Sequence, residues 1–225
     1  IHPRPNPKGL PAFIEQYKKL ITGELPDQKF KGTYNELYKW ETVQWFQDHW
    51  NDDHTGESLP ALLEQSFSKK GNNLWSGAHY FPFGMLTDMT KTHPSELSGM
   101  FRNLFNENVG LNERLQAFES FGEQYIAQHR PDVKNHYQSR RAMMVYLTLR
   151  HPEKYVFYKK GMFDDFCNFT KFWPPFGRAN KGDYSVIMDF LEMCGHLKDV
   201  LESDLELLAC HRARLPETIT FDDGD

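Results

Sequence analysis

Cysteine is scarce in this chain of 225 residues, with Cys167, Cys194 and Cys210 as the only three. An odd number at wide spacing argues against a disulfide framework and against a four-ligand zinc site, so we expect a reducing, cytoplasmic setting. Long apolar runs are also missing. The longest is about 142–149, far below the roughly 18 residues of a membrane-spanning helix, so no membrane association is expected. The chain begins at Ile1 with neither methionine nor an apolar signal core, and we expect it to be cut from a longer polypeptide.

The common catalytic motifs are absent from the sequence. It contains no G-x-x-x-x-G-K-[ST] phosphate loop, no G-x-G, no G-x-S-x-G, no H-E-x-x-H and no C-x-x-C. We therefore expect a chain that is not an enzyme, that uses no cofactor and that carries no metal site.

Two weaker catalytic patterns remain to be weighed. His49, Asp52, Asp53 and His54 are ligand types that hold a divalent cation, although a solvated acidic turn is the commoner explanation of such a cluster. Asp132-Val133-Lys134 has the D-x-K form of metal-dependent nucleases, with Glu119 or Glu123 as an upstream acid. It follows Pro131 in an expected loop rather than on a strand, which disfavours a nuclease.

Hydrophobic spacing predicts a mainly α (α+β) fold. Apolar residues recur at helical steps over 11–21, 37–50, 58–67, 95–105, 112–126, 138–150, 162–169, 184–200 and 203–212. The composition of Lys154–Lys159 predicts one short strand, alone or in a small hairpin. The length suits a single domain over 1–215, and the acidic end 216–225 is expected to be a linker or tail.

Positive charge gathers in one segment of an otherwise acidic chain. The net charge is −5, yet eight basic residues and two acidic ones lie between His129 and Lys160. Tyrosines are interleaved with these cations, a mixture typical of phosphate neutralisation combined with base stacking. An ordinary solvated face with half-buried tyrosines is the alternative. The predicted DNA-binding residues are Lys134, Arg140, Arg141, Arg150, Lys154, Lys159 and Lys160.

Aromatic residues in two loop-like stretches, Leu74–Gly84 and Phe172–Gly177, suggest a pocket for a base. Its predicted walls are Trp75, His79, Tyr80 and Trp173. Such side chains more often fill a helical core, so both interpretations stay open.

Four stretches carry a resemblance to a known family. They are Tyr38-Lys39-Trp40-Glu41, Asn73–Pro82, Met100–Phe105 and, above all, Lys134–Lys159. These stretches resemble the N-terminal region of bacterial McrB-like AAA+ proteins, the motor subunits of modification-dependent restriction systems, over about residues 38–210. The resemblance implies a module that recognises DNA, often with a modified base. It also implies a downstream AAA+ domain that hydrolyses GTP and a separate nuclease subunit as partners. Because this chain lacks a phosphate loop, the GTPase activity is not carried over to it.

Three functions follow in order of expectation. The first is a non-catalytic DNA-binding module of an antiviral defence protein. The second is a protein-interaction or phage-sensing domain of the same kind of protein, anchored by exposed aromatic residues. The third is a metal-dependent nuclease that uses Asp132 and Lys134.

Overall fold

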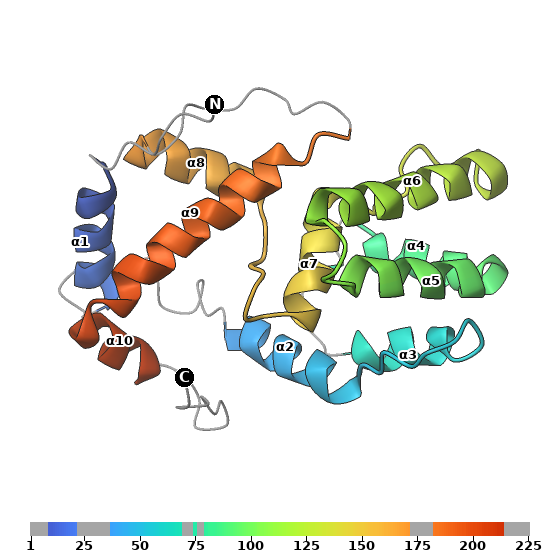
Figure 1. Cartoon of the computed structure of the whole chain (residues 1–225), viewed down its shortest axis with the longest axis horizontal. Coiled ribbons are helices and arrows are strands. Elements are labelled where there is room, and N and C mark those ends of the chain that lie inside the picture. Colours follow the sequence, from blue (N-terminus) through green and yellow to red (C-terminus); the bar gives the residue numbers. More distant parts are fainter. Residues whose placement is uncertain (1–8, 22–36, 69–73, 76–78, 172–181, 214–225) are drawn as a thin grey trace. The chain divides into compact units, whose positions relative to one another are not determined.

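Helices form almost all the regular structure in the described part of the chain, which confirms the expected mainly helical fold. The computed structural model describes residues 9–21, 37–68, 74–75, 79–171 and 182–213. The helices within these ranges are α1 (Leu10–Ile21), α2 (Leu37–His49), α3 (Leu59–Ser66), α4 (Pro82–Thr92), α5 (Pro94–Phe105), α6 (Leu111–His129), α7 (Arg140–Arg150), α8 (Lys160–Thr170), α9 (Ser185–Glu202) and α10 (Leu205–Arg212) (Figure 1).

The prediction of a strand at Lys154–Lys159 is wrong. Residues 155–159 run between α7 and α8 without forming a strand, and a single bridge at Tyr80 is the only β feature in the described ranges. The side chains of Tyr155 and Tyr158 are buried in the core, which explains why the composition of the segment is that of a strand. The tyrosine side chains, and not backbone pairing, hold this segment in place.

Contacts divide the chain into two compact units, whereas the sequence led us to expect a single domain. Unit 1 comprises residues 1–40, 159–180 and 188–225, and unit 2 comprises residues 41–158 and 181–187. Helices α2 and α9 each contribute residues to both units. The expected tail 216–225 lies outside the described residues.

Unit 2 is built around α7. All eight residues from Ala142 to Leu149 are buried, as expected for a helix that is apolar on every side. Helices α5 and α6 lie side by side and both pack against α7 (Figure 1), while α4 packs against α3 and α5. The apolar run that the sequence shows at this point is therefore the core of unit 2.

Proline begins three helices of unit 2. Pro60, Pro82 and Pro94 occupy the first or second position of α3, α4 and α5, where the missing N–H is tolerated and the fixed φ suits the helix. Helix α4 was not predicted, because its start lies in the stretch expected to be a loop. Ser58, the residue before α3, makes no side-chain cap bond to that helix. Its Oγ instead accepts the Thr55 N–H (2.9 Å).

A buried arginine joins the start of α6 to the loop before it. Arg114 is only 2% exposed and donates to the Leu104 carbonyl, to Glu107 Oε1 and to the Tyr155 hydroxyl, each at 2.7 Å. The Tyr155 hydroxyl donates in turn to Glu107 (2.8 Å), and Lys154 also pairs with that carboxylate. The network fixes residues 154 and 155 against α6.

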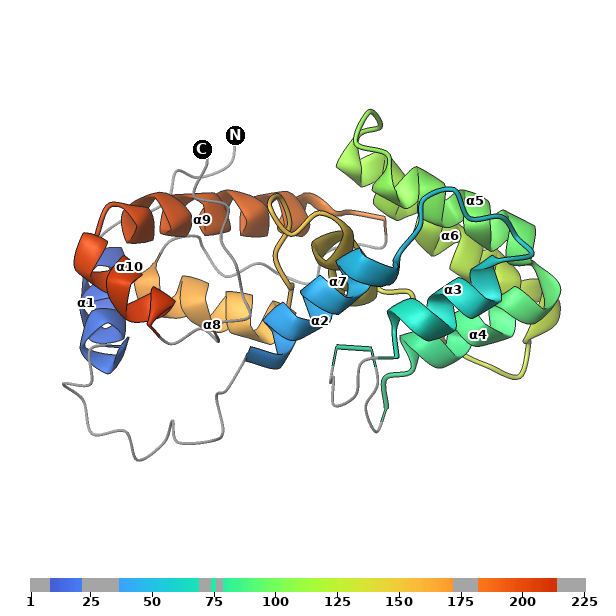
Figure 2. The ribbon, with the colours of Figure 1, turned by 90° about the horizontal axis from the view of Figure 1, so that it is seen from below.

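Unit 1 has its own aromatic core and a group of ion pairs that joins α1 to the start of α10. Helix α1 packs against α8 and α10 (Figure 2), with Phe13 edge-on to Phe166 at 4.9 Å between ring centroids. Lys18 bridges to Asp204 (2.9 Å) and to Glu206 (2.8 Å). Asp204 also accepts the Leu207 N–H, so it caps α10.

We expect Arg114→Met to destabilise unit 2 by about 3 kcal/mol, because it leaves the Leu104 carbonyl and one side of Glu107 without a donor in a buried place. Lys91→Met removes an exposed ion pair with Asp88 and is the matched control, with an expected loss below about 1 kcal/mol. Urea denaturation followed by circular dichroism measures both. Equal losses in the two variants would show that the Arg114 network does not stabilise the fold.

We expect the Glu107 carboxylate to make stability depend on pH. Burial opposes its charged form, but hydrogen bonds from Lys154, Tyr155 and Arg114 outweigh this and lower the pKa of Glu107 below its ordinary value of 4.5. Its contribution is therefore complete above about pH 4.5 and is lost as the pH falls through the lower, folded-state pKa. The stability difference between wild type and Glu107→Gln should shrink on acidification. A difference that stays constant down to pH 3 contradicts the assignment.

Candidate functional site

Three of the seven predicted DNA-binding cations are engaged by carboxylates. Arg150 pairs with Asp52, with Nε donating to Oδ1 at 3.2 Å, and Lys154 pairs with Glu107. Lys160 pairs with Asp164 at 2.5 Å. Lys159 and Lys160 moreover belong to unit 1, and the other five cations belong to unit 2. Much of the basic surplus seen along the sequence is thus neutralised locally.

The tyrosines of the same segment mostly face the core. Tyr146, Tyr155 and Tyr158 are buried, and only Tyr137 is partly exposed. Rings that fill the core are not available to stack on a base. Three of these four tyrosines are therefore core residues and not stacking platforms for a base.

The other three predicted DNA-binding residues of unit 2 are Lys134, Arg140 and Arg141, which lie in the segment Lys134–Arg141. Lys134 is exposed and forms no ion pair with any residue in the described ranges. The Arg141 guanidinium lies over the Tyr80 ring, 4.4 Å from its centroid, and that of Arg140 lies 5.3 Å from the centroid of Tyr184. Both arginines are half-buried, so each stacks on a ring and still reaches the surface.

The predicted base pocket is not assembled in the described residues. Trp75 is buried against Phe67, with 4.9 Å between ring centroids, while His79 is exposed. Tyr80 is half-buried beneath Arg141, and burial raises its pKa to about 12, so its hydroxyl stays neutral at physiological pH. Trp173 lies outside the described residues.

The loop from Pro131 to Ser139 is held in one conformation. Asn135 Oδ1 accepts the Tyr137 N–H at 2.7 Å, and Tyr137 has a left-handed backbone (φ 59°), which is rarely adopted by residues other than glycine. Gln138 is fully buried. Its Nε2 donates to the Pro82 carbonyl (2.9 Å), and its Oε1 accepts from the Tyr146 hydroxyl (2.8 Å).

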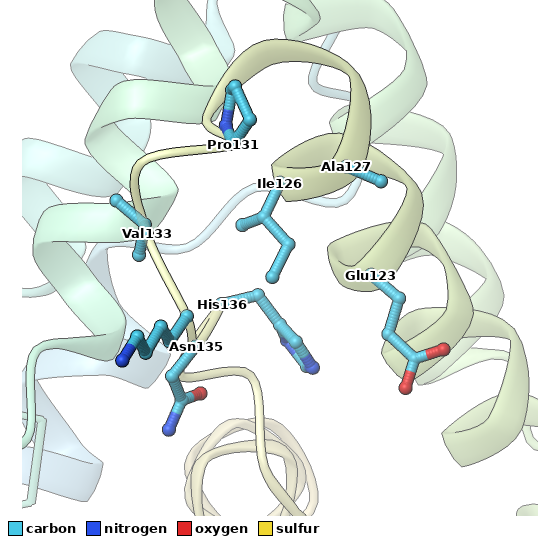
Figure 3. Close-up of a pocket in the computed structure, with 8 residues that line it drawn as sticks. Glu123, Ile126, Ala127, Pro131, Val133, Asn135 and His136 are labelled. Atoms are coloured by element: carbon cyan, nitrogen blue, oxygen red, sulfur yellow. The ribbon is translucent and has the colours of Figure 1, made fainter.

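This loop and the end of α6 enclose a pocket of about 430 Å³ (Figure 3). Glu123 and the ring of His136 lie on one side of it, and Pro131 and Val133 lie toward the other end. The pocket is lined by Glu123, Ile126, Ala127, Pro131, Val133, Lys134, Asn135 and His136. It therefore offers a carboxylate, an imidazole, an amide and an ammonium group around an apolar floor.

Two of these polar side chains, together with the neighbouring Glu119, come within reach of one ion. Glu119, Glu123 and His136 each offer a ligand atom, and the three atoms lie within 4.8 Å of one another. The His136 ring packs directly on Gly122, where an added Cβ would lie 2.4 Å from Nδ1. The Tyr184 hydroxyl donates to Glu119. Burial and the nearby Glu119 carboxylate raise the pKa of Tyr184, which keeps that hydroxyl a donor.

The two catalytic patterns weighed from the sequence are arranged differently from expectation. Asp132 pairs with Arg130 (3.1 Å), whereas Lys134 and Glu123 line the pocket. Asp52 is engaged by Arg150, and His54 turns inward, with Nδ1 2.9 Å from Ser98 Oγ. Sequence reasoning missed His136. The signals for it were its place two residues beyond Lys134 and the glycine between Glu119 and Glu123.

We expect Gly122→Ala to displace the His136 loop and to destabilise unit 2 by about 1–3 kcal/mol, as overpacking does. Gly99→Ala on α5 is the matched control. Nothing lies within 4 Å of its added Cβ, so it should stabilise by about 0.5–1 kcal/mol through helix propensity. Thermal denaturation gives both values. A Gly122→Ala protein as stable as Gly99→Ala would mean that the ring does not rest on α6.

No protein-family model, curated protein or solved structure matches this chain. The resemblance to McrB-like proteins therefore remains a prediction from the sequence. Across the described ranges, no helix combines the length and the apolar character needed to cross a membrane.

Proposed function

We propose that this chain is a non-catalytic DNA-binding module of a McrB-like defence protein, acting in the cytoplasm. The observation that carries the proposal is the segment Lys134–Arg141, in which Lys134 lies in an anchored loop beside a pocket and Arg140 and Arg141 are the first two residues of α7. The interface proposed here is smaller than the seven-residue set expected from the sequence. Recognition of a modified base, a downstream AAA+ domain and a separate nuclease belong to the proposal through the resemblance alone.

The engaged cations have a lesser role in this interface. A phosphate that approaches Arg150 or Lys154 must compete with Asp52 or Glu107, so little counterion is released there. Lys134 lines a pocket with Glu123 but forms no ion pair with a described side chain, and Arg141 presents a guanidinium already oriented by Tyr80. Phosphate contacts of this kind position a protein on DNA and do not by themselves read its sequence.

A specific observation favours a second function, the protein-interaction domain. Unit 1 exposes large apolar side chains, with Leu205 79%, Met162 64% and Phe169 52% exposed. Exposed apolar groups of this size are typical anchors of protein interfaces. These residues belong to unit 1 and the proposed DNA-binding loop belongs to unit 2, so the two functions use different residues.

The two lysines at positions 134 and 154 provide a test of DNA binding. Lys134→Gln and Lys154→Gln remove the same charge, but only Lys134 lacks a carboxylate partner among the described residues. We expect Lys134→Gln to lower the slope of log affinity against log salt by about 1, and Lys154→Gln to leave it nearly unchanged. Fluorescence anisotropy with a labelled duplex at several salt concentrations measures the slopes.

Thermal denaturation of both variants serves as the control for folding, because Lys154 also contacts the Arg114 network. Wild-type protein that fails to bind DNA at low salt would end the proposal. Equal slopes in wild type and Lys134→Gln would remove the loop from the interface.

A further inference from the structure

We propose that Glu119, Glu123 and His136 bind one divalent first-row transition-metal ion, such as Mn²⁺ or Zn²⁺, at the edge of the α6 pocket. Glu119 and Glu123 are one helical turn apart on the same face of α6. His136 reaches them from the following loop, and the three ligand atoms lie within 4.8 Å of one another. Ligand bonds of about 2.0–2.2 Å to a common centre require ligand atoms no more than about 4.4 Å apart, so the three side chains need at most a small rotation to hold one ion.

The donor set indicates the class of ion. Two carboxylate oxygens alone would suit Mg²⁺ or Ca²⁺, but an imidazole nitrogen favours the series from Mn²⁺ to Zn²⁺. All three side chains are only half-buried, so an ion reaches them without unfolding the chain. Three protein ligands leave coordination positions open to water or to another ligand.

Surrounding groups orient these ligands. The Tyr184 hydroxyl donates to Glu119 and restrains its carboxylate, as outer hydrogen bonds do in metal sites. Gly122 lets the His136 ring lie directly against α6 between the two glutamates. The loop that carries His136 is anchored by the buried Gln138.

A hydrogen bond to the His136 ring opposes the ion. The Gln138 N–H donates to His136 Nδ1 at 3.1 Å, so the proton of the neutral ring is on Nε2. Binding at Nε2 moves that proton to Nδ1, and binding at Nδ1 displaces the amide. The Gln138 bond is lost in either case, so we expect an affinity in the micromolar range and not that of a structural zinc site.

The ion would also change what the pocket attracts. Without it, the carboxylates of Glu119 and Glu123 repel a phosphate that approaches Lys134. With it, the open coordination positions and Lys134 both favour a phosphate oxygen. This consequence rests on the proposed DNA-binding function, whereas ion binding itself does not.

The test is a titration of the whole chain with MnCl₂ in the absence of DNA, followed by the loss of the electron paramagnetic resonance signal of free Mn²⁺. Mn²⁺ has little affinity for thiols, so the three cysteines do not interfere. We expect one ion per chain and about 10-fold or greater weakening in Glu123→Gln and in His136→Gln. Glu113→Gln, an exposed carboxyl on the same helix, is the matched control and should bind as wild type does.

Absence of binding by the wild type overturns the site, as does equal binding by Glu123→Gln and Glu113→Gln. Thermal denaturation without metal identifies a variant that fails to fold, and the second variant then decides. Comparing DNA affinity in Mn²⁺ and in EDTA separates the two proposals. Ion binding without DNA binding refutes only the DNA-binding module, and DNA binding without ion binding refutes only the metal site.

Discussion

The hydrogen-bond chain from Tyr146 through Gln138 to the Pro82 carbonyl is the constraint on which the candidate site depends. Tyr146 belongs to α7, which is buried on every side and cannot move without disrupting the core of unit 2. Gln138 has no exposed surface, so losing either bond would leave a buried amide group unsatisfied. The loop before α7 is therefore tied to the core through Gln138. Its neighbours His136, Lys134 and Arg140 acquire defined positions although they are at the surface.

Charge counted along the sequence overestimates the charge that a ligand meets. The acids that neutralise Arg150 and Lys154 are Asp52 and Glu107, which lie 98 and 47 residues earlier in the chain. A count within the basic segment cannot include them. Lys160 is different, because its partner Asp164 is one turn along the same helix and was visible in the sequence. Of the four cations that leave the interface, Arg150 and Lys154 are lost to tertiary pairing, which no window of sequence reveals, and Lys159 and Lys160 belong to unit 1.

The helical fold was largely predictable because apolar spacing and burial coincide, and α7 is the clearest case. Helix α4 was missed because Pro82 was taken as a loop residue, although proline is also common at the first turn of a helix. The strand at Lys154–Lys159 was predicted from composition, but the tyrosines of this segment fill the core and do not belong to a strand. Of the candidate site, Lys134, Arg140 and Arg141 were identified. The joining of His136 to Glu119 and Glu123 was not, because it depends on how the loop returns to α6.

Helix α6 explains why charges of both signs meet in one place. Arg114, in the first turn of α6, is buried and pairs with Glu107. Glu119 and Glu123, in the middle of the same helix, lie close to His136 of the loop. Two carboxylates beside a cationic loop weaken the attraction for a polyanion unless something neutralises them. Tyr184 donates a hydrogen bond to Glu119 but brings no positive charge, and the Gln138 N–H donates to His136 Nδ1. A bound cation would remove this conflict. Under the two proposals, the acidic pair would link metal binding to DNA binding, and each would strengthen the other.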